Sequence, residues 1–330
     1  MRRATAVLVL AAMLAIGGPA AVATAHEPRS GFRKVRVPPS MAVYEWHNAG
    51  DLAPAEVQRR LRFLRANGFD TVYLEIGNYL EAADLRPEDP IRKTRMDSIR
   101  RQIQRFVATA SSLGLSVQAL GGGPTWTQEP RRYLGPLLVE LVGSYNTKVA
   151  YNERLKGIHL DLEPYTLEGW LREDRVAANL VEYLKTIQEI VATYRWQLDR
   201  WANRGLQLGF AIPFWFDGRG DAPGEVVFGE ESKPAAYHVI DLISDRTSNG
   251  SIAHARDEFR YAASIGARSG LIVGQQYGPA APEEQHITFH GQPRWVFRRA
   301  AAEIAVAFRR YPQFRGLSVD DIDAFMAAGP

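Results

Sequence analysis

Residues 157–165 read GIHLDLEPY, which is the pattern of a β-strand with one apolar and one ionisable face. The apolar positions are Ile158, Leu160 and Leu162, and the ionisable positions between them are His159, Asp161 and Glu163. An ionised carboxylate removed from water is costly unless it is paired or serves a purpose. We therefore expect the ionisable face of this strand to look into a binding or catalytic site.

Seven other runs of β-forming residues flank this strand, and longer helical patterns lie between them. Strands are predicted at 41–46, 71–76, 115–120, 157–163, 206–214, 238–244, 270–275 and 316–320. Helices are predicted at 54–66, 97–112, 131–149, 172–204, 253–265 and 294–310. Trp196 and Trp201 are assigned to the buried stripe of the helix at 172–204.

Alternation of eight strands with helices predicts an α/β fold with a parallel sheet, and about eight such units suit a (β/α)8 TIM barrel. We expect a single barrel domain over residues 41–330, because no low-complexity linker interrupts it. The fifth βα unit is irregular, since residues 217–237 are rich in Gly, Pro and acids and show no clear helix. An open dinucleotide-binding sheet is the rival fold, but no G-x-G-x-x-G follows any predicted strand.

The N-terminal segment has the layout of a secretory signal peptide. Arg2 and Arg3 precede an apolar run that is too short to span a bilayer, and small residues end the segment at Ala25. We expect cleavage after Ala25, an N-terminal extension over 26–40, and a secreted or periplasmic protein with no membrane attachment after signal removal. An uncleaved N-terminal anchor is the alternative.

Composition excludes several classes of function. The chain of 330 residues contains no cysteine, so disulfides, thiolate metal sites and thiol nucleophiles are excluded. The formal charge of +3 becomes +1 when Arg2 and Arg3 are removed with the signal peptide. This small charge gives no bias toward nucleic acid. We expect a monomer.

Acidic and aromatic residues, with two glutamines, gather where the predicted strands end, which is where barrel enzymes place their sites. Such residues are Glu45, Trp46, Glu75, Trp126, His159, Asp161, Glu163, Tyr165, Trp215, Asp217, Asp245, Gln275, Gln276, Tyr277 and Asp320. Carboxylates can serve a glycosidic oxygen and an oxocarbenium ion, and aromatic faces can stack on a pyranose. The pattern gives Glu163 a functional role, and it predicts the others, apart from Asp161, Asp245 and Gln276, as contacts to a carbohydrate substrate.

Simpler interpretations apply to some of these signals. The acids Asp320, Asp321 and Asp323 follow the last strand, and strand-end acids often cap the next helix. The glycines at 121–123 lack the Lys-Ser/Thr of a phosphate loop, so a tight turn or a groove floor is expected. His159 has no second histidine at metal-ligand spacing. We predict neither a metal nor a cofactor.

The segment from Lys156 to Glu163 resembles the fourth-strand signature of glycoside hydrolase family 18, D-G-x-D-x-D-x-E. The whole chain more closely resembles a divergent group of bacterial family-18-like barrel proteins. The pieces that carry this resemblance are ALGGGPTW (119–126), YN (151–152), GIHLDLEPY (157–165), IPFW (212–215), ITFHG (287–291) and FRGLSVDDIDAF (314–325). In family 18 the glutamate is the general acid, and the aspartate two residues earlier orients the substrate's N-acetyl group. The resemblance therefore implies these roles for Glu163 and Asp161.

The chain departs from the family-18 pattern at several positions. Lys156 and His159 replace the first two aspartates, and residues 243–246 read ISDR where the family has M-x-Y-D. If the acetamido route does not operate, Asp245, Asp217 or Glu75 would supply the nucleophile or base. Two further hypotheses stay open. One is a non-catalytic carbohydrate-binding barrel, and the other is a hydrolase of another bond type or a metal enzyme using the acids after the eighth strand.

Overall fold

The computed structural model describes residues 40–172, 174–213, 237–241, 247–264, 266–267 and 270–330. Eight parallel strands close into a barrel in sequence order, and β8 pairs with β1 through Met41 opposite Leu317 and Val43 opposite Val319. The strands are β1 (Met41–Glu45), β2 (Thr71–Glu75), β3 (Ser116–Gly121), β4 (Gly157–Leu160), β5 (Gln207–Pro213), β6 (Tyr237–Asp241), β7 (Gly270–Gln275) and β8 (Phe314–Val319). The predicted (β/α)8 barrel is confirmed.

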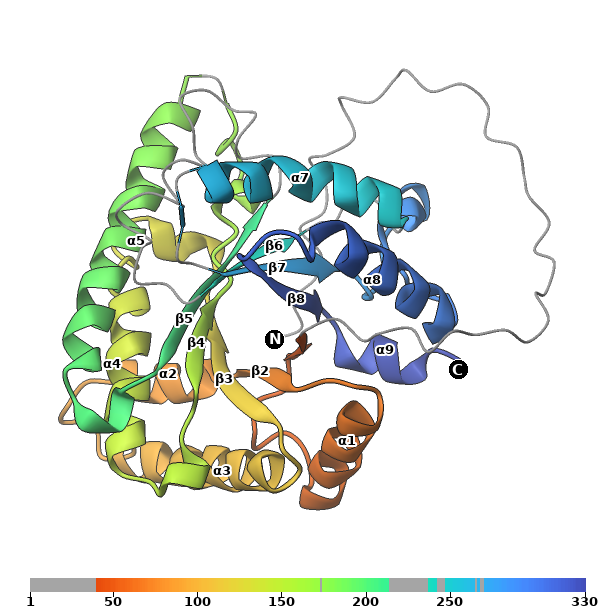
Figure 1. Cartoon of the computed structure of the whole chain (residues 1–330). Helices are drawn as coiled ribbons and strands as arrows, with labels where there is room; N and C mark the ends of the chain where they lie inside the picture. Colours follow the sequence, from red (N-terminus) through yellow and green to blue (C-terminus); the bar gives the residue numbers. More distant parts are fainter. Residues whose placement is uncertain (1–39, 173, 214–236, 242–246, 265, 268–269) are drawn as a thin grey trace.

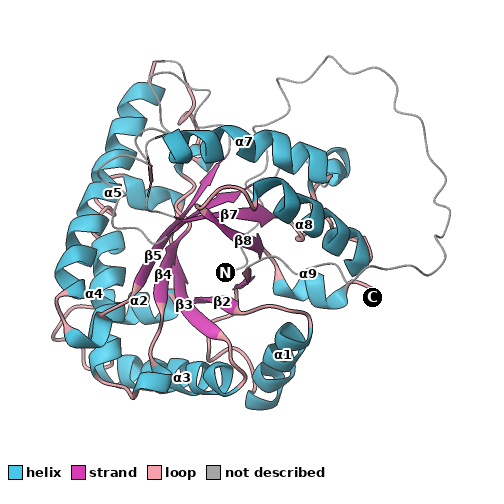
Figure 2. Cartoon of the chain, in the orientation of Figure 1, coloured by secondary structure: helices cyan, strands magenta, loops and turns pink. Residues whose placement is uncertain are grey.

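Helices form a layer around the strands (Figures 1 and 2). The α-helices are α1 (Pro54–Ala66), α2 (Gly77–Asp84), α3 (Arg92–Ser112), α4 (Leu134–Thr147), α5 (Val176–Leu198), α7 (Ser248–Ser264), α8 (Arg294–Phe308) and α9 (Ile322–Ala327). Short 3-10 turns are η1 (Pro124–Thr127), η2 (Tyr151–Glu153), η3 (Pro164–Thr166), η4 (Trp201–Asn203) and η7 (Pro282–Ile287). The sequence did not predict α2 and α9. None of the helices in the described parts of the chain combines the length and apolar character needed to cross a bilayer.

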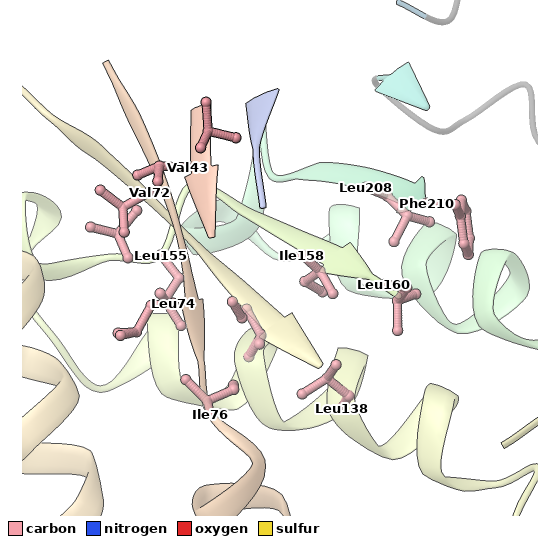
Figure 3. Close-up of a cluster of buried hydrophobic side chains, with 14 of the residues drawn as sticks. Val43, Val72, Leu74, Ile76, Leu138, Leu155, Ile158, Leu160, Leu208 and Phe210 are labelled. Atoms are coloured by element: carbon pink, nitrogen blue, oxygen red, sulfur yellow. The ribbon is translucent and has the colours of Figure 1, made fainter. Parts of the chain in front are cut away.

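Most of the buried apolar side chains lie between the barrel and its helices. In β4 these are Ile158 and Leu160, which belong to one continuous core with Leu138 of α4. Figure 3 shows part of this layer, with Leu208 and Phe210 of β5 also among the labelled residues. Burying a side chain of this size stabilises the fold by about 1.5–3 kcal/mol. The apolar face of the opening stretch thus faces the helices, as its alternation predicts.

A second, smaller core fills the barrel itself. It consists of Ala42, Tyr44, Tyr73, Leu120 and Ile272, which are all buried. Because successive strand residues point to opposite sides of the sheet, these positions identify the inward-facing series on β1, β2, β3 and β7. They decide which strand-end residues face the mouth of the barrel.

One core prediction is wrong. Trp196 is 54% exposed, although the stripe of α5 was expected to bury it. The buried residues of α5 include Ile187, Val191 and Tyr194, and position 196 lies about 200° around the helix from 194. Its indole instead lies 4.5 Å from the guanidinium of Arg200. The side chain of Trp201 lies outside the described part of the structure, as do the predicted signal peptide, residues 26–39 and the irregular fifth unit at 217–236.

Candidate active site

Glu163 follows the end of β4 in an unusual backbone conformation. Its φ of 40° and ψ of 47° place it in the left-handed region, and no other non-glycine residue among those described has a positive φ. The left-handed region is strained for a residue with a side chain, and such strain often occurs at functional sites. The turn is held by Thr166, whose amide and hydroxyl both donate to the carbonyl oxygen of Glu163, at 3.1 and 2.8 Å.

The half-buried carboxylate of Glu163 is oriented by the residue two positions later. The hydroxyl of Tyr165 donates a hydrogen bond of 2.7 Å to Oε1 of Glu163. Both residues belong to the short turn that Pro164 opens, so the acid and its donor are fixed within one local structure. The structure therefore brings together two of the predicted site residues.

Asp161 lies on the inward-facing side of β4, because Leu160 and Leu162 on either side of it belong to the outer core. Its amide donates to the carbonyl oxygen of Gly121 at 3.0 Å, which continues the β3–β4 pairing. Gly122 then passes so close that a Cβ there would lie 2.1 Å from the carbonyl oxygen of Asp161. The glycine run at 121–123 is thus a tight approach of two strand ends, and Gly122 has the positive φ of 145° that favours glycine.

Tyr183 of α5 lies near the same carboxylate, and the sequence analysis did not identify it. It is buried, and its pKa is raised by burial and then by the negative charge of Asp161. The phenol therefore remains neutral at ordinary pH. No local sequence signal marks Tyr183, because its neighbour in space is 22 positions away on another element.

An aromatic layer lies inside the barrel beneath these acids. The ring of His159 stacks on Tyr73 with centroids 4.1 Å apart, and its Nε2 lies 2.8 Å from the hydroxyl of Tyr44. His159 and Tyr73 are fully buried, and Tyr44 is 2% exposed. The prediction of His159 as a substrate contact is therefore wrong, because its ring is a layer below the surface that a ligand can reach.

Trp46 and Asp320 meet on the rim where β1 and β8 lie side by side. The indole Nε1 of Trp46 donates to the carbonyl oxygen of Asp320 at 2.5 Å, and its ring stacks on Tyr44 with centroids 5.4 Å apart. Trp46 is 36% exposed, so an open area of aromatic surface remains. These contacts join the two ends of the sheet at the mouth.

The carboxylate of Asp320 accepts two amide hydrogen bonds, from Tyr277 at 2.5 Å and Gly278 at 3.2 Å. Burial raises its pKa to about 7, against the opposing effect of the Tyr277 amide, and the charge of Asp321 adds to the rise. Asp320 therefore ties the segment after β7 to the end of β8.

Glu75 and Trp126 also lie at strand ends. Oε1 of Glu75 accepts the amide of Gly77 at 2.8 Å, and its side chain is half-buried on the inward-facing series of β2. The indole of Trp126 is 8% exposed and lies against Gly121 and Gly123. Glu75 thus faces the mouth, whereas Trp126 mainly covers the glycine turn.

Three predicted substrate contacts point away from the mouth, and those predictions are wrong. Glu45 is 1% exposed and pairs with Arg60 of α1 at 3.0 Å, and burial raises its pKa despite that cation. Gln275 is buried and hydrogen-bonds to Ser251 of α7. The ring of Tyr277 is fully buried against phenylalanines of the outer core.

These three side chains point away from the mouth because successive residues of a strand face opposite sides of the sheet. Odd positions of β1 and β7 face the helices, so strand-end position alone does not decide which residues line the site. The first inward position after the end of β7 is Gln276, which is half-buried. Its Oε1 is a buried atom without a hydrogen-bond partner among the described contacts. Gln276 is among the strand-end residues of the sequence but not among the predicted substrate contacts.

The acids after β8 diverge. Oδ1 of Asp321 accepts the amide of Ala324 at 2.9 Å and caps α9, which confirms the capping interpretation for that residue. Asp323 is an ion-pair partner of Arg60, and Asp320 binds the segment after β7. Within the described residues, no group of three or more His, Asp or Glu side chains is placed to hold a metal ion.

The predicted residues Trp215, Asp217 and Asp245 lie outside the described part of the chain.

No protein-family model matches this sequence, and no curated protein matches it either. Its structure is similar to that of a family-18 chitinase from Pseudoalteromonas aurantia, with a TM-score of 0.51, 12% identity, and coverage of 86% of this chain and 94% of that one. It is also similar to a family-5 enzyme (GH5_18) from Streptomyces cattleya solved with GlcNAc, with a TM-score of 0.54, 17% identity, and coverage of 86% and 70%. The catalytic domain of a β-amylase from Paenibacillus polymyxa gives a TM-score of 0.54, 10% identity, and coverage of 86% and 92%. At these identities the likeness establishes a barrel fold that the chain shares with glycoside hydrolases.

Proposed function

We propose that this chain is a glycoside hydrolase in which Glu163 is the general acid and Asp161 is its partner. The observation that carries the proposal is the strained left-handed turn at Glu163, at the end of a barrel strand, with its carboxylate held by Tyr165. A structural acid could be placed on an ordinary backbone at no strain, so the conformation supports a role in orientation. The fold shared with glycoside hydrolases supports the same reaction class.

In the proposed reaction, Glu163 gives its proton to the glycosidic oxygen as the bond from that oxygen to the anomeric carbon breaks. The electron pair leaves with the oxygen, and positive charge develops on the sugar ring. Asp161 orients and stabilises the group that attacks the anomeric carbon from the other side. This group is the substrate's own acetamido oxygen if the glycan is N-acetylated, or a second carboxylate such as Asp245 or Glu75.

A water molecule then completes the hydrolysis, and Glu163 takes its proton. The open face of Trp46 offers a surface on which a sugar ring could stack near the mouth. We further propose that the protein is exported after loss of residues 1–25, because the N-terminal segment has the layout of a secretory signal peptide.

The test compares the mature chain beginning at His26 with its Glu163→Gln variant on N-acetylated and non-acetylated polysaccharides, scoring new reducing ends. Glu168→Gln is the matched control, because this exposed glutamate lies five positions further on. Loss of general-acid catalysis should lower the rate on the order of 10²–10⁴-fold in Glu163→Gln and leave the control active. Equal cleavage by both variants would contradict the proposal. Binding without cleavage, equal in all three proteins, would favour a non-catalytic carbohydrate-binding barrel.

A further inference from the structure

A cavity lies at the opposite end of the barrel from Glu163. It has a volume of about 400 Å³ and opens beside the first residues of β4 and β5. Its apolar lining includes Leu155 and Leu206, and its cationic lining consists of Arg154, Lys156 and Arg204. The described residues that line it include no aspartate or glutamate. The cavity therefore combines an apolar base with three cationic side chains on its walls.

Lys156 is the cation whose surroundings are best defined. Its Nζ donates to the carbonyl oxygen of Tyr151 at 3.2 Å and lies 3.9 Å from the centre of the Tyr151 ring. Burial lowers the pKa of Lys156, and the positive charge of Arg154 lowers it further. The surroundings thus disfavour the charged ammonium, and a bound anion would reverse this effect.

Tyr151 belongs to the YN motif at 151–152, which the proposed hydrolase site does not use. Its side chain is 74% exposed, and the guanidinium of Arg154 lies 5.8 Å from its ring centre. An aromatic ring this open at the edge of a cationic cavity gives a flat contact surface beside the charges. The volume also lies within the range of about 300–1,000 Å³ that is usual for small-molecule sites and exceeds the need of a bare ion.

We propose that this cavity binds a small organic molecule through a phosphate, sulfate or carboxylate group held by Lys156, Arg204 and Arg154. The charged group lies among the three cations, and the body of the ligand lies over Leu155 and beside Tyr151. This site is separate from the proposed hydrolase site, since it is built at the N-terminal ends of the strands. Its test does not depend on whether Glu163 is catalytic.

Calorimetric titration at low ionic strength, with glucose 6-phosphate, glucuronate, inorganic phosphate and neutral glucose as probes, tests the proposal. At least one of the organic anions should bind saturably, more weakly as NaCl is added, while glucose should not bind. Inorganic phosphate that binds as tightly as glucose 6-phosphate would assign the site to the free ion and overturn the organic ligand. No saturable binding of any anion would overturn the site.

Two variants connect the binding to the cavity. Lys156→Gln should weaken the best anion at least tenfold, and Arg204→Gln, which changes an exposed side chain and carries little folding risk, at least fivefold. Lys93→Gln removes the same charge from an exposed position in α3 outside the cavity and should bind as the unmodified protein does. Equal affinity in Lys156→Gln and Lys93→Gln would show that the anion binds elsewhere and would overturn the assignment.

Discussion

The hydroxyl of Tyr165 donates to Oε1 of Glu163 across 2.7 Å, within a turn that Thr166 closes by two further bonds to the Glu163 carbonyl. The donor, the acid and the residue that closes the turn are therefore parts of one four-residue structure, residues 163–166. Precise placement of a catalytic group matters because small displacements of the reacting atoms cost rate.

We expect Tyr165→Phe to lower kcat about tenfold and to leave KM nearly unchanged, because the ring stays and only the orienting hydroxyl is lost. Steady-state kinetics on the polysaccharide found in the first screen measures both constants. Tyr133→Phe is the matched control, since the exposed Tyr133 also donates to a carboxylate, that of Asp84 at 2.8 Å, away from the site. Equal kcat values in the two variants would show that the Tyr165 hydroxyl does not position the acid.

The left-handed backbone at Glu163 predicts that glycine is more stabilising than alanine at this position, which is the reverse of the order in a helix. We expect Glu163→Gly to be more stable than Glu163→Ala by about 1–2 kcal/mol, because both variants lose the carboxylate and only alanine keeps the Cβ strain. Urea unfolding curves measure the difference. At the exposed helical position Glu189 of α5, the order should be normal, with alanine more stable by about 1 kcal/mol. If the alanine variant were more stable than the glycine variant at both positions, the turn at Glu163 would not be strained.

The close approach of β3 and β4 predicts that Gly122 is intolerant of any side chain. Gly122→Ala places a Cβ 2.1 Å from the carbonyl oxygen of Asp161, so the strand ends must separate. We expect a loss of about 3 kcal/mol or more in the free energy of unfolding, together with loss of activity as Asp161 moves. Gly205→Ala is the control, because Gly205 also has a positive φ, of 80°, but no atom within 4 Å of the added Cβ. A similar cost at both positions would contradict the steric argument.

The raised pKa of Asp320 predicts a pH dependence of stability with a definite sign. A carboxyl whose pKa rises from 3.8 to about 7 on folding binds its proton more tightly when folded. The contribution of Asp320 to the free energy of unfolding is therefore complete below pH 4. It is lost as the pH rises toward 7, with a slope of up to about 1.4 kcal/mol per pH unit.

We expect Asp320→Asn, which keeps an acceptor for the amides of Tyr277 and Gly278, to lose this slope. Free energies of unfolding measured at several pH values between 4 and 8 give the comparison. The free energy of unfolding of the variant should increase relative to that of the unmodified protein as the pH rises. Parallel curves would mean that Asp320 ionises in the folded protein as it does in the unfolded chain.

The barrel and the polar face of β4 could be predicted because both depend on local alternation. Every predicted strand is present, and Ile158 and Leu160 face the helices as expected. The lining of the mouth could not be predicted as well. Glu45 and Tyr277 end strands in sequence, but their odd positions face the helices, where Arg60 and a group of phenylalanines surround them.

Contacts between distant segments were also beyond the sequence pattern. Tyr183 approaches Asp161 from α5, and Tyr44 approaches His159 across 115 positions of sequence. A stricter count of inward positions would have selected Gln276 in place of Gln275 and Tyr277, because it shares the parity of the inward-facing Ile272. It would also have placed Tyr44 and Tyr73 on the inward face, because they share the parity of Trp46 and Glu75. Nothing local would have selected Tyr183.

The aromatic layer of Tyr44, Tyr73 and His159 affects the route by which a ligand can enter and leave the barrel. It is part of the packed interior that is typical of a (β/α)8 barrel, so a glycan bound at the mouth would lie across the rim and would not pass along the axis. In the proposed reaction, substrate and product would then share one entrance, and the cleaved fragment would have to leave before the next chain binds. A ligand in the cavity at the other end cannot diffuse to Glu163 along this axis, and any influence between the two ends has to pass through the packed protein itself.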